Sequence, residues 1–453
     1  MVRRHYRTID MLNGPLLLNL VRFAIPLVLA NILQLMYNAA DMVVVGRFAE
    51  NGAAALAAVG ATSPVTGILN NIGGGFAVGI SVLIAQHIGA DDRRSVFETV
   101  HTALGIGFIG GACIGAAGVL LSRPLLTMMG TPADVMDGAV LYMRINMAAQ
   151  LVALPFAFIA GIFRAAGNTT RPTLILCCTG ILNVLLNLLF VIGFGMGVEG
   201  VALATLFANV VNLVWGFWSL MHTDGIHKLY AREIKIYKTQ LGKILKIGIP
   251  TMIQASVYNV SNLFVQASLN TFPSYVGAGN VASANFNGFL GTAMGTLSAA
   301  NLTFTGQNVG AKKYERLGRI NGTCSLMAVA IGVVNAALIL VGPLVLQLYT
   351  TDPRAIEAGM ARMIFADTWM FLYYISDVQI GSLRAMGRST LAMVLSMIGS
   401  VGVQLVWILT VFRIWFPTSL PALYLCYPTS FLLNCITAGT AFVLVSRRLK
   451  KQG

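Results

Sequence analysis

Charged residues are scarce in this chain of 453 residues: Asp, Glu, Lys and Arg make up 10% of it, and hydrophobic residues make up 57%. A soluble globular domain carries about 25% charged residues. The composition therefore excludes a soluble protein and indicates an integral membrane protein. Apolar segments of about 20 residues or more, each long enough to cross a bilayer, recur along the chain. Because they are continuous and do not alternate with polar residues, they predict helices and not a barrel.

Constellations for catalysis or metal binding are also missing. The five histidines form no ligand cluster, the six cysteines lie in apolar spans, and no Gly-x-Ser-x-Gly elbow or HExxH motif occurs. The glycine-rich run at 71–79 lacks the lysine of a phosphate loop, and close helix packing explains it better. We therefore expect no enzyme and no cofactor. Uphill transport would have to draw on an ion gradient.

The net charge of +14 reflects membrane topology. Lysines and arginines gather at both termini and in alternate connections, whereas the other connections hold only Arg47, Arg123, Arg354 and Arg413. This positive-inside pattern predicts that both termini lie in the cytoplasm. Nucleic acid is not an expected partner, because no basic face is interleaved with aromatic residues. No small-residue cleavage site precedes Pro26, so we expect the first span to be retained.

Twelve membrane spans are predicted, six on each side of a polar, basic stretch at 222–245. The predicted spans are 20–46, 57–86, 97–121, 136–162, 173–194, 200–221, 246–272, 282–308, 318–342, 356–381, 391–412 and 421–445. We expect an N-terminal bundle at 1–221, a cytoplasmic linker at 222–245 and a C-terminal bundle at 246–453.

An internal repeat relates the two halves. Ile25-Pro26 matches Ile249-Pro250, AQHIGADDR at 85–93 matches GQNVGAKKY at 306–314, and GIFRAAGNTTRP at 161–172 matches GSLRAMGRSTLA at 381–392. The offsets are 224, 221 and 220 residues. An even number of spans brings both halves into the membrane from the same side, as in parallel transporter repeats. The predicted fold class is an all-α membrane protein of two six-helix bundles, related by a pseudo-two-fold axis along the membrane normal.

A polar stripe in the first span is the strongest candidate for a site. Gln34, Asn38 and Asp41 are spaced i, i+4 and i+7, so they share one helix face. A carboxylate in the hydrocarbon zone costs from about 2.5 to over 10 kcal/mol, so it usually faces a cavity and carries function. The alternative is an Asp anchored at the outer interface near Arg47. Burial in a dry site would favour the protonated acid, and hydrogen bonds from the amides would favour the ionised form.

Further polar residues interrupt the apolar spans of both halves. Asn183 and Asn187 lie one turn apart on the same face of the fifth span. Because an unpaired amide in hydrocarbon is costly, we expect both to face a carboxylate or a cation and not lipid. Tyr142 and Thr205 add hydroxyl groups, although Tyr142 also fits an interface anchor. In the second half, Val265 stands at the position equivalent to Asp41. The polar candidates there are Tyr258, Asn259, Asn262, Asp367 and Asp377, and the two acids have Arg362 and Arg384 as alternative structural partners.

Three segments together resemble the multidrug and toxic compound extrusion (MATE) transporters. They are QLMYNAADMVVVGR in the first span, GIFRAAGNTTRPT after the fourth, and LNVLLNLLFVIGFGMGVEGVALAT across the fifth and sixth. The resemblance runs essentially end to end. It implies a V-shaped pair of bundles, alternating access, and efflux of cationic amphiphilic drugs in exchange for protons or sodium ions.

The resemblance also implies residue roles. Asp41 matches the first-span acid tied to cation coupling, while Asn187 stands where many relatives carry a second Asp and Tyr258 where one branch has a Glu. Asp377 lies one helical turn from that branch's tenth-span Asp. We therefore predict a coupling site at Asp41, Asn38, Asn183, Asn187 and Thr205, and substrate binding by Gln34, Tyr142, Tyr258, Asn259, Asn262, Asp367 and Asp377.

Three functional hypotheses follow from these patterns. The first is a secondary active exporter of cationic amphiphiles, monomeric, in the cytoplasmic (inner) membrane among lipids. The second is a flippase for lipid-linked saccharides, which would need several Arg or Lys residues inside the central cavity, whereas the basic residues here lie in loops. The third, a receptor or channel without ion coupling, is disfavoured by the repeat and the cleft that it implies.

Overall fold

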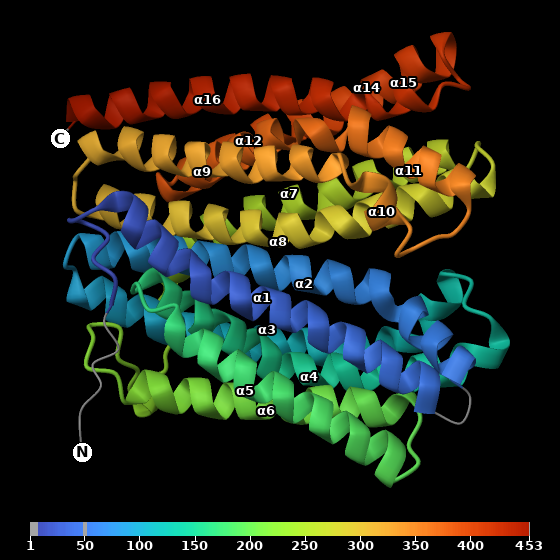
Figure 1. Cartoon of the computed structure of the whole chain (residues 1–453). Coiled ribbons are helices and arrows are strands. Elements are labelled where there is room, and N and C mark those ends of the chain that lie inside the picture. The colour runs from blue at the N-terminus through green and yellow to red at the C-terminus, as the bar shows by residue number, and fades with distance from the viewer. Residues whose placement is uncertain (1–7, 49–51, 453) are drawn as a thin grey trace. The chain divides into compact units, whose positions relative to one another are not determined.

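The computed structural model describes residues 8–48 and 52–452, and within these ranges the chain is helical with short connections and no strand (Figure 1). Long helices satisfy their own backbone hydrogen bonds, which a hydrocarbon environment requires. The helices of the first half are α1 (Leu16–Phe48), α2 (Gly52–Gly89), α3 (Arg93–Met128), α4 (Ala133–Ala165), α5 (Thr170–Leu188), extended by a π-helical turn at Leu189–Gly193, and α6 (Val198–Met221).

The second half has more interruptions. Its helices are α7 (Lys238–Leu269), α8 (Ser274–Gly310), α9 (Glu315–Ile339), α10 (Gly342–Leu346), α11 (Pro353–Phe365), α12 (Met370–Ala385), α13 (Ser389–Ser396), α14 (Val403–Trp407), α15 (Leu420–Tyr424) and α16 (Cys426–Gln452). A 3-10 turn at Asp367–Trp369 divides the tenth predicted span. π-Helical segments at Met397–Gly402 and Ile408–Trp415 lie in the eleventh.

Nine helical segments of the described residues are long and apolar enough to cross a membrane. They coincide with the first to sixth, ninth, eleventh and twelfth predicted spans. The other three predicted spans correspond to α7, α8 and the pair α11–α12. The first two of these are long but more polar, and the pair is interrupted at Asp367–Trp369. The chain is therefore a multi-pass membrane protein.

The chain divides into two compact units. Among the described residues, unit 1 consists of residues 8–9, 25–48 and 52–248, and unit 2 of residues 10–24 and 249–452. Both main boundaries fall at the repeated Ile-Pro sequence, so α1 and α7 each begin in one unit and continue in the other. Residues 10–24 thus group with the second half of the chain, unlike in the predicted division. The predicted linker also ends early, because α7 already begins at Lys238.

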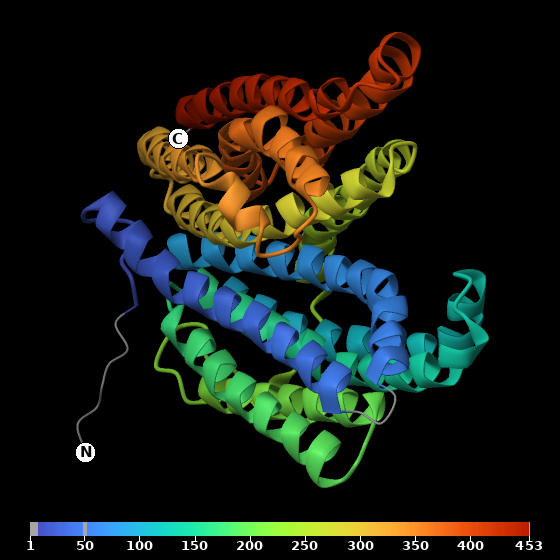
Figure 2. The same ribbon diagram turned by 45° about the vertical axis from the view of Figure 1, so that its right-hand side comes forward.

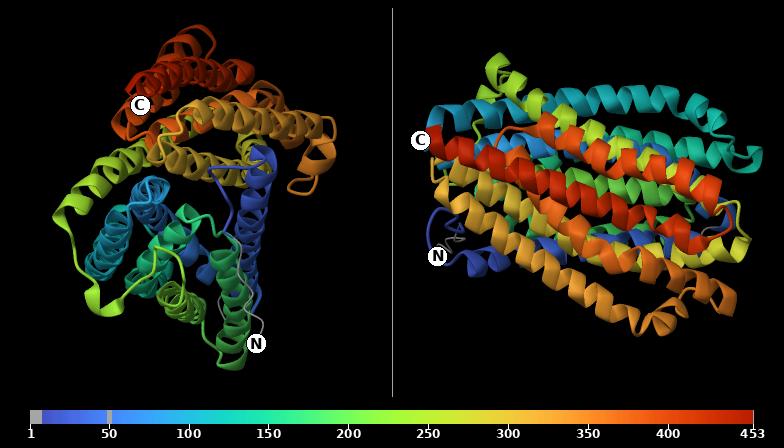
Figure 3. Two further views of the ribbon diagram at one scale, coloured as in Figure 1. Left: turned by 90° about the vertical axis from the view of Figure 1, so that its left-hand side faces the viewer. Right: turned by 90° about the horizontal axis from the view of Figure 1, so that it is seen from above.

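Packing within each unit follows the repeat. In unit 1, α4 packs against α2, α3 and α6; in unit 2, α12 packs against α8, α9 and α16. These are the helices that the sequence offsets make equivalent. Figures 2 and 3 show α2 to α6 of unit 1, coloured from blue to green, and α8 to α16 of unit 2, coloured from yellow to red. The internal repeat is therefore a repeat of packing as well as of sequence.

The connection between α6 and α7 is anchored to the N-terminal part of α3. The backbone N–H of Tyr230 donates to His101 Nε2 at 3.2 Å, and that of Tyr237 donates to Thr102 Oγ1 at 3.0 Å. His227 is 5% exposed, and its ring meets that of Phe163 edge-on at 5.9 Å. The polar linker predicted from the sequence therefore contains a buried histidine.

Acid should destabilise this connection through His227. Burial, and next the guanidinium of Arg171, lower the pKa of His227 from its ordinary 6.5 to about 4. The unfolded chain therefore takes up this proton first, so stability falls as the pH falls from 6.5 towards 4, by at most about 3 kcal/mol. Thermal unfolding of purified protein at a series of pH values should show this slope, and His227→Phe should flatten it. An unchanged slope in the variant would assign the acid sensitivity to other groups.

Candidate ion and substrate sites

A chain of hydrogen bonds joins α1, α5 and α6 in unit 1. Asn187 donates from Nδ2 to the carboxylate of Asp41 and, at 3.4 Å, to Oδ1 of Asn183. Asn183 in turn donates from Nδ2 to Thr205 Oγ1 at 3.4 Å. Asn187 is fully buried, and its Oδ1 has no hydrogen-bond partner among the described residues. Four of the predicted coupling residues are thus in one connected network.

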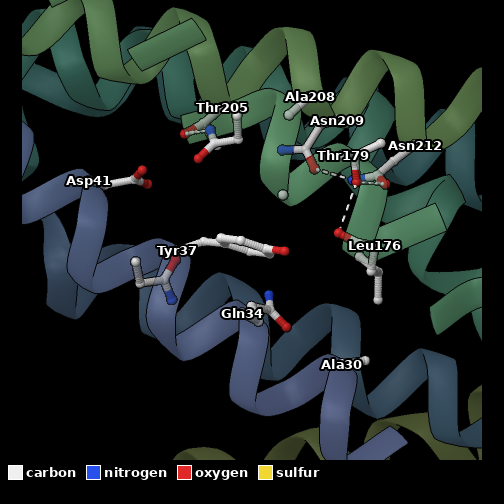
Figure 4. A pocket seen from close by; sticks show the side chains of 13 residues that line it. Ala30, Gln34, Tyr37, Asp41, Leu176, Thr179, Thr205, Ala208, Asn209 and Asn212 are labelled. Atoms are coloured by element: carbon white, nitrogen blue, oxygen red, sulfur yellow. Dashed lines mark hydrogen bonds between the residues drawn. The ribbon is translucent and has the colours of Figure 1, made fainter. Parts of the chain in front are cut away.

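This network borders a cavity of about 120 Å³. Figure 4 shows Gln34, Tyr37 and Asp41 on α1 on one side and Thr179, Thr205 and Asn209 on the other. The lining residues are Ala30, Gln34, Tyr37, Asn38, Asp41, Leu176, Thr179, Gly180, Asn183, Thr205, Ala208, Asn209 and Asn212. Asp41 is the one charged member of this set, so the cavity carries an uncompensated negative charge whenever Asp41 is ionised.

The other predicted residues of unit 1 have different positions. Gln34 and Asn38 line the cavity but make no hydrogen bond to Asp41 in the described part of the chain. Tyr142 does not line it, and packs instead against an apolar cluster that includes Val44 and Val201. Gln34 and Asn38 therefore line the same cavity as Asp41, whereas Tyr142 belongs to the packing of the unit.

Sequence reasoning missed a second polar group on the same cavity. Thr179 Oγ1 donates to Asn212 Oδ1 at 2.6 Å, and Asn212 Nδ2 donates to Asn209 Oδ1 at 3.5 Å. A signal was available, because Thr179 continues the stripe of Asn183 at a spacing of four residues. Asn209 and Asn212 likewise share one face of α6. These amides and hydroxyls extend the polar lining away from Asp41.

Tyr37 fills the gap between α1 and α5. Its hydroxyl donates to the backbone oxygen of Cys177 at 3.1 Å, and its ring lies against Gly180. A Cβ at residue 180 would lie 1.7 Å from Tyr37 Cε2. Glycine is therefore required at this position while the tyrosine keeps its place.

Gly180→Ala should lower stability by about 1–3 kcal/mol, the usual cost of overpacking. Adding Tyr37→Ala should recover part of that loss by removing the clashing ring. Gly67→Ala in α2 is the matched control, because a Cβ there has no heavy atom within 4 Å. Thermal unfolding in detergent micelles measures all of these variants. Equal effects of the two glycine substitutions would show that Tyr37 does not occupy this position.

Unit 2 pairs its own first helix with the segment equivalent to α5. Three side-chain hydrogen bonds join α7 to the α13–α14 segment. They run from Gln254 Nε2 to Ser396 Oγ at 2.8 Å, from Tyr258 OH to Ser400 Oγ at 3.1 Å, and from Ser261 Oγ to Gln404 Oε1 at 2.5 Å. The equivalent helix pair is thus polar in both units, although unit 2 has no acid on α7.

A cavity of about 270 Å³ lies beside these bonds. Its lining residues are Tyr258, Asn262, Asn287, Arg362, Ala366, Asp367, Met370, Tyr373, Gln404, Tyr427 and Phe431. Asp367 is 3% exposed, accepts from Ser283 Oγ at 2.7 Å, and lies 3.7 Å from Arg362 Nε. Asp367 begins the 3-10 turn after α11, and its backbone oxygen accepts from Asn335 Nδ2 at 3.0 Å. The interruption of the tenth span thus positions this acid.

The remaining predicted residues of unit 2 lie outside this cavity. Asn259 is exposed on α7, and Asp377 is half-buried on α12 without an ion pair among the described residues. Arg384 donates to Gln254 Oε1 at 2.7 Å, and Arg362 is the arginine paired with Asp367. Of the alternatives left open by the sequence, the structure therefore realises the pair of Asp367 with Arg362.

The two cavities differ in charge balance. The lining of the unit 1 cavity has one acid and no base, whereas the unit 2 cavity has Asp367 opposite Arg362. The unit 2 cavity is also more aromatic, with Tyr373 and Phe431 in ring contact at 5.3 Å. Of the two cavities, the unit 1 cavity alone therefore offers an added cation an unpaired carboxylate.

Membrane-spanning helices in two repeated units, each with a polar cavity, define a transporter-like membrane protein. Comparison with known families makes the assignment specific. The family model MatE matches residues 26–189 and again residues 249–409. The two matches repeat the internal offset found in the sequence. The chain belongs to the MatE family, and its fold is the family's twelve transmembrane helices in two bundles.

Curated relatives match over most of the chain. The "Probable multidrug resistance protein YpnP" of Bacillus subtilis is 26% identical over 405 residues, which is 86% of this chain and 87% of that protein. The "Probable multidrug resistance protein NorM" of Thermotoga maritima is 23% identical over 389 residues, covering 84% and 82%. The homologues are bacterial multi-pass membrane proteins, and their family transports small molecules.

Solved structures share the fold. An outward-facing multidrug resistance MATE family transporter of the MOP superfamily has a TM-score of 0.90 at 22% identity, covering 98% of this chain and 99% of that one. A MOP superfamily transporter from Pyrococcus furiosus has a TM-score of 0.89 at 21% identity, with the same coverage. At these identities the likeness concerns the fold, and it agrees with the fold class predicted from the sequence.

Proposed function

We propose that this chain is a secondary active multidrug antiporter. It exports cationic amphiphilic compounds in exchange for protons or sodium ions, and it works by alternating access of its two bundles. It resides in the cytoplasmic membrane with both termini in the cytoplasm, as the distribution of lysine and arginine among the loops favours. The names of the YpnP and NorM relatives, which refer to multidrug resistance, support the same substrate class.

The observation that carries the proposal is the uncompensated acid in unit 1. Asp41 borders a polar cavity, and its partner Asn187 is neutral, so no basic side chain of the cavity lining competes with an incoming cation. A proton would bind Asp41 directly. A sodium ion would bind through oxygen atoms, for which Asp41, Asn183 and Thr205 offer a carboxylate, an amide and a hydroxyl oxygen.

Binding of the ion would alter the hydrogen bond between Asp41 and Asn187. That bond joins α1 to α5, so a change in the charge of Asp41 changes the packing of these two helices. Asp41, Asn38, Asn183, Asn187 and Thr205 thus form the proposed coupling site. The proposal needs a difference in affinity between the two access states, because a ligand shifts a conformational equilibrium only by its differential affinity.

Substrate contacts are proposed for both cavities. Gln34 in unit 1 and Tyr258, Asn262 and Asp367 in unit 2 line them. The rings of Tyr373, Tyr427 and Phe431 give the unit 2 cavity aromatic faces, to which organic cations are attracted. Tyr142, Asn259 and Asp377 do not line the two cavities, so substrate binding by these residues stays a prediction from the sequence.

The flippase alternative would need several basic residues facing the transport route. Among the residues that line the two polar cavities, Arg362 is the one such residue, and Asp367 neutralises it. This arrangement favours an exporter of cations over a carrier of pyrophosphate-linked saccharides.

Efflux of a panel of cationic dyes from vesicles tests the proposal. Reconstituted protein should export at least one dye uphill. Collapse of one gradient, proton or sodium, should stop this export while collapse of the other leaves it running, and the effective collapse identifies the coupling ion. Uphill export that survives the collapse of both gradients would refute secondary antiport. Uphill movement of an anionic saccharide lipid in place of the dyes would favour the flippase.

A further inference from the structure

One turn of the repeat has opposite charge in the two units. The α2–α3 turn carries Asp91 at φ 50°, and the α8–α9 turn carries Lys312 at φ 56°. The turns close with the same backbone bonds, from residue 91 to 88 at 3.1 Å and from residue 312 to 309 at 3.1 Å. Asp91-Asp92 in unit 1 is thus replaced by Lys312-Lys313 in unit 2. Because the geometry is the same, the lysines are not needed for the turn.

The lysine turn borders an open hollow of about 490 Å³. Pockets for small ligands measure about 300–1,000 Å³. The hollow is lined by Lys312, Lys313, Tyr314, Glu315, Arg316 and Lys450. Four basic groups thus face one acid, which gives a net positive site where the α8–α9 connection meets the C-terminal end of α16 (Figure 1).

Part of this positive charge is already engaged. Lys313 Nζ donates to Leu12 O at 3.2 Å and to Asn13 Oδ1 at 2.9 Å, and Arg316 also donates to Leu12 O. Lys312 and Lys450 make no ion pair or hydrogen bond with another described side chain. Two ammonium groups on one hollow therefore remain available for an anion, while the segment before α1 holds the other two.

The two helices that lead away from the hollow, α9 and α16, carry exposed apolar side chains. On α9, Leu326 is 69% exposed and Val333 is 62% exposed; on α16, Val443 is 43% exposed. Val443 lies seven residues before Lys450, which is two turns or about 10 Å along a helix, so the two side chains share a face of α16. A phospholipid whose head group occupies the hollow could thus place its acyl chains along these two helices. Basic pockets on the cytoplasmic side of membrane helices bind anionic lipid head groups in this way.

We propose that this hollow is a binding site for a phosphate-bearing anion, supplied by an anionic phospholipid of the cytoplasmic leaflet. Lys312 and Lys450 contact the phosphate. Lys313 and Arg316 add to the positive electrostatic potential of the hollow while they bind the segment before α1. The proposal concerns the end of unit 2 where α8 and α16 end, and it does not depend on the ion or the substrate that the protein transports.

Binding of phosphatidylglycerol to the full-length protein in neutral detergent tests this site. Native mass spectrometry would count bound lipid over a titration, with phosphatidylcholine as the neutral lipid and inorganic phosphate as the soluble anion. Phosphatidylglycerol should bind in preference to phosphatidylcholine. Lys450→Ala should weaken the binding of phosphatidylglycerol about fivefold. Lys312→Asn should weaken it to a similar degree, and Asn is chosen because it tolerates the positive φ of residue 312. Phosphatidylglycerol should also raise the unfolding temperature more than phosphatidylcholine does, and more in the wild type than in either variant.

Lys451→Ala is the matched control, because Lys451 has the same charge one residue further along α16 but does not line the hollow. It should retain most of the lipid affinity. Equal losses for Lys450→Ala and Lys451→Ala would show attraction to the general surface charge and overturn the site. Equal binding of phosphatidylcholine would overturn it as well. Saturation by inorganic phosphate alone would retain the site but assign it to a soluble anion in place of the lipid.

Discussion

Asp41→Asn should abolish uphill dye export by reconstituted vesicles under a proton or sodium gradient. The amide keeps the size of the side chain and a hydrogen-bonding contact with Asn187, but it can neither ionise nor supply a negative charge to a cation. Export should fall to the level of vesicles without protein. Downhill exchange of dye should persist, because the substitution leaves the cavity and its other polar groups in place.

Asp137→Asn is the control for this loss. Asp137 forms an exposed ion pair with Arg123 at 3.3 Å, outside both cavities. The same chemical change should therefore leave export unaltered. Wild-type rates of uphill export in Asp41→Asn would refute the coupling role of Asp41. Loss of folded protein in that variant, seen by size-exclusion chromatography, would call for Asp41→Glu, which keeps the charge and should retain coupled export.

Breaking the pair of Arg362 and Asp367 should have the largest effect on stability. Arg362→Met leaves the carboxylate of Asp367 buried without its cationic partner, which typically costs about 3–5 kcal/mol. Asp367→Leu should lower the free energy of unfolding by a similar amount, because it leaves the buried guanidinium of Arg362 without its anionic partner. The hydrogen bond from Arg362 NH1 to Asn280 Oδ1 at 2.5 Å would remain. Thermal unfolding in detergent measures both losses.

The double variant separates the pair from its individual residues. Arg362→Met with Asp367→Leu removes both charges, so its loss should be clearly smaller than the sum of the two single losses. Arg123→Met is the matched control, because it breaks an exposed pair that should contribute less than about 1 kcal/mol. Additive losses in the double variant would show that the two side chains do not stabilise each other.

Much of the architecture follows from the sequence because membrane insertion leaves few options. Apolar segments long enough to span must be helical, and the repeat at 85–93 and 306–314 predicts which helices of the two halves correspond. The stripe from Gln34 to Asp41 could be predicted for the same reason, since an acid in a span has to face polar groups. Asn183 and Asn187 were the amides available in the same half.

Other features depended on contacts that no local pattern encodes. The interruption at Asp367–Trp369 has its equivalent in the continuous helix α4, so the repeat alone would predict no break there. Asn335 from α9 binds the backbone oxygen released at that turn. Likewise, the closeness of Tyr37 to Gly180 depends on the separation of two helices. Such distances are set by packing and not by periodicity.

The most direct test of the coupling claim is the affinity of purified protein for a cationic dye, measured at stepwise pH and sodium concentrations. If ion and dye exclude each other through Asp41, a rising concentration of the coupling ion should weaken dye binding in the wild type. By linkage, dye should weaken ion binding to the same degree. In Asp41→Asn, dye affinity should become independent of that ion. An unchanged ion dependence in Asp41→Asn would contradict the account and place the coupling site elsewhere.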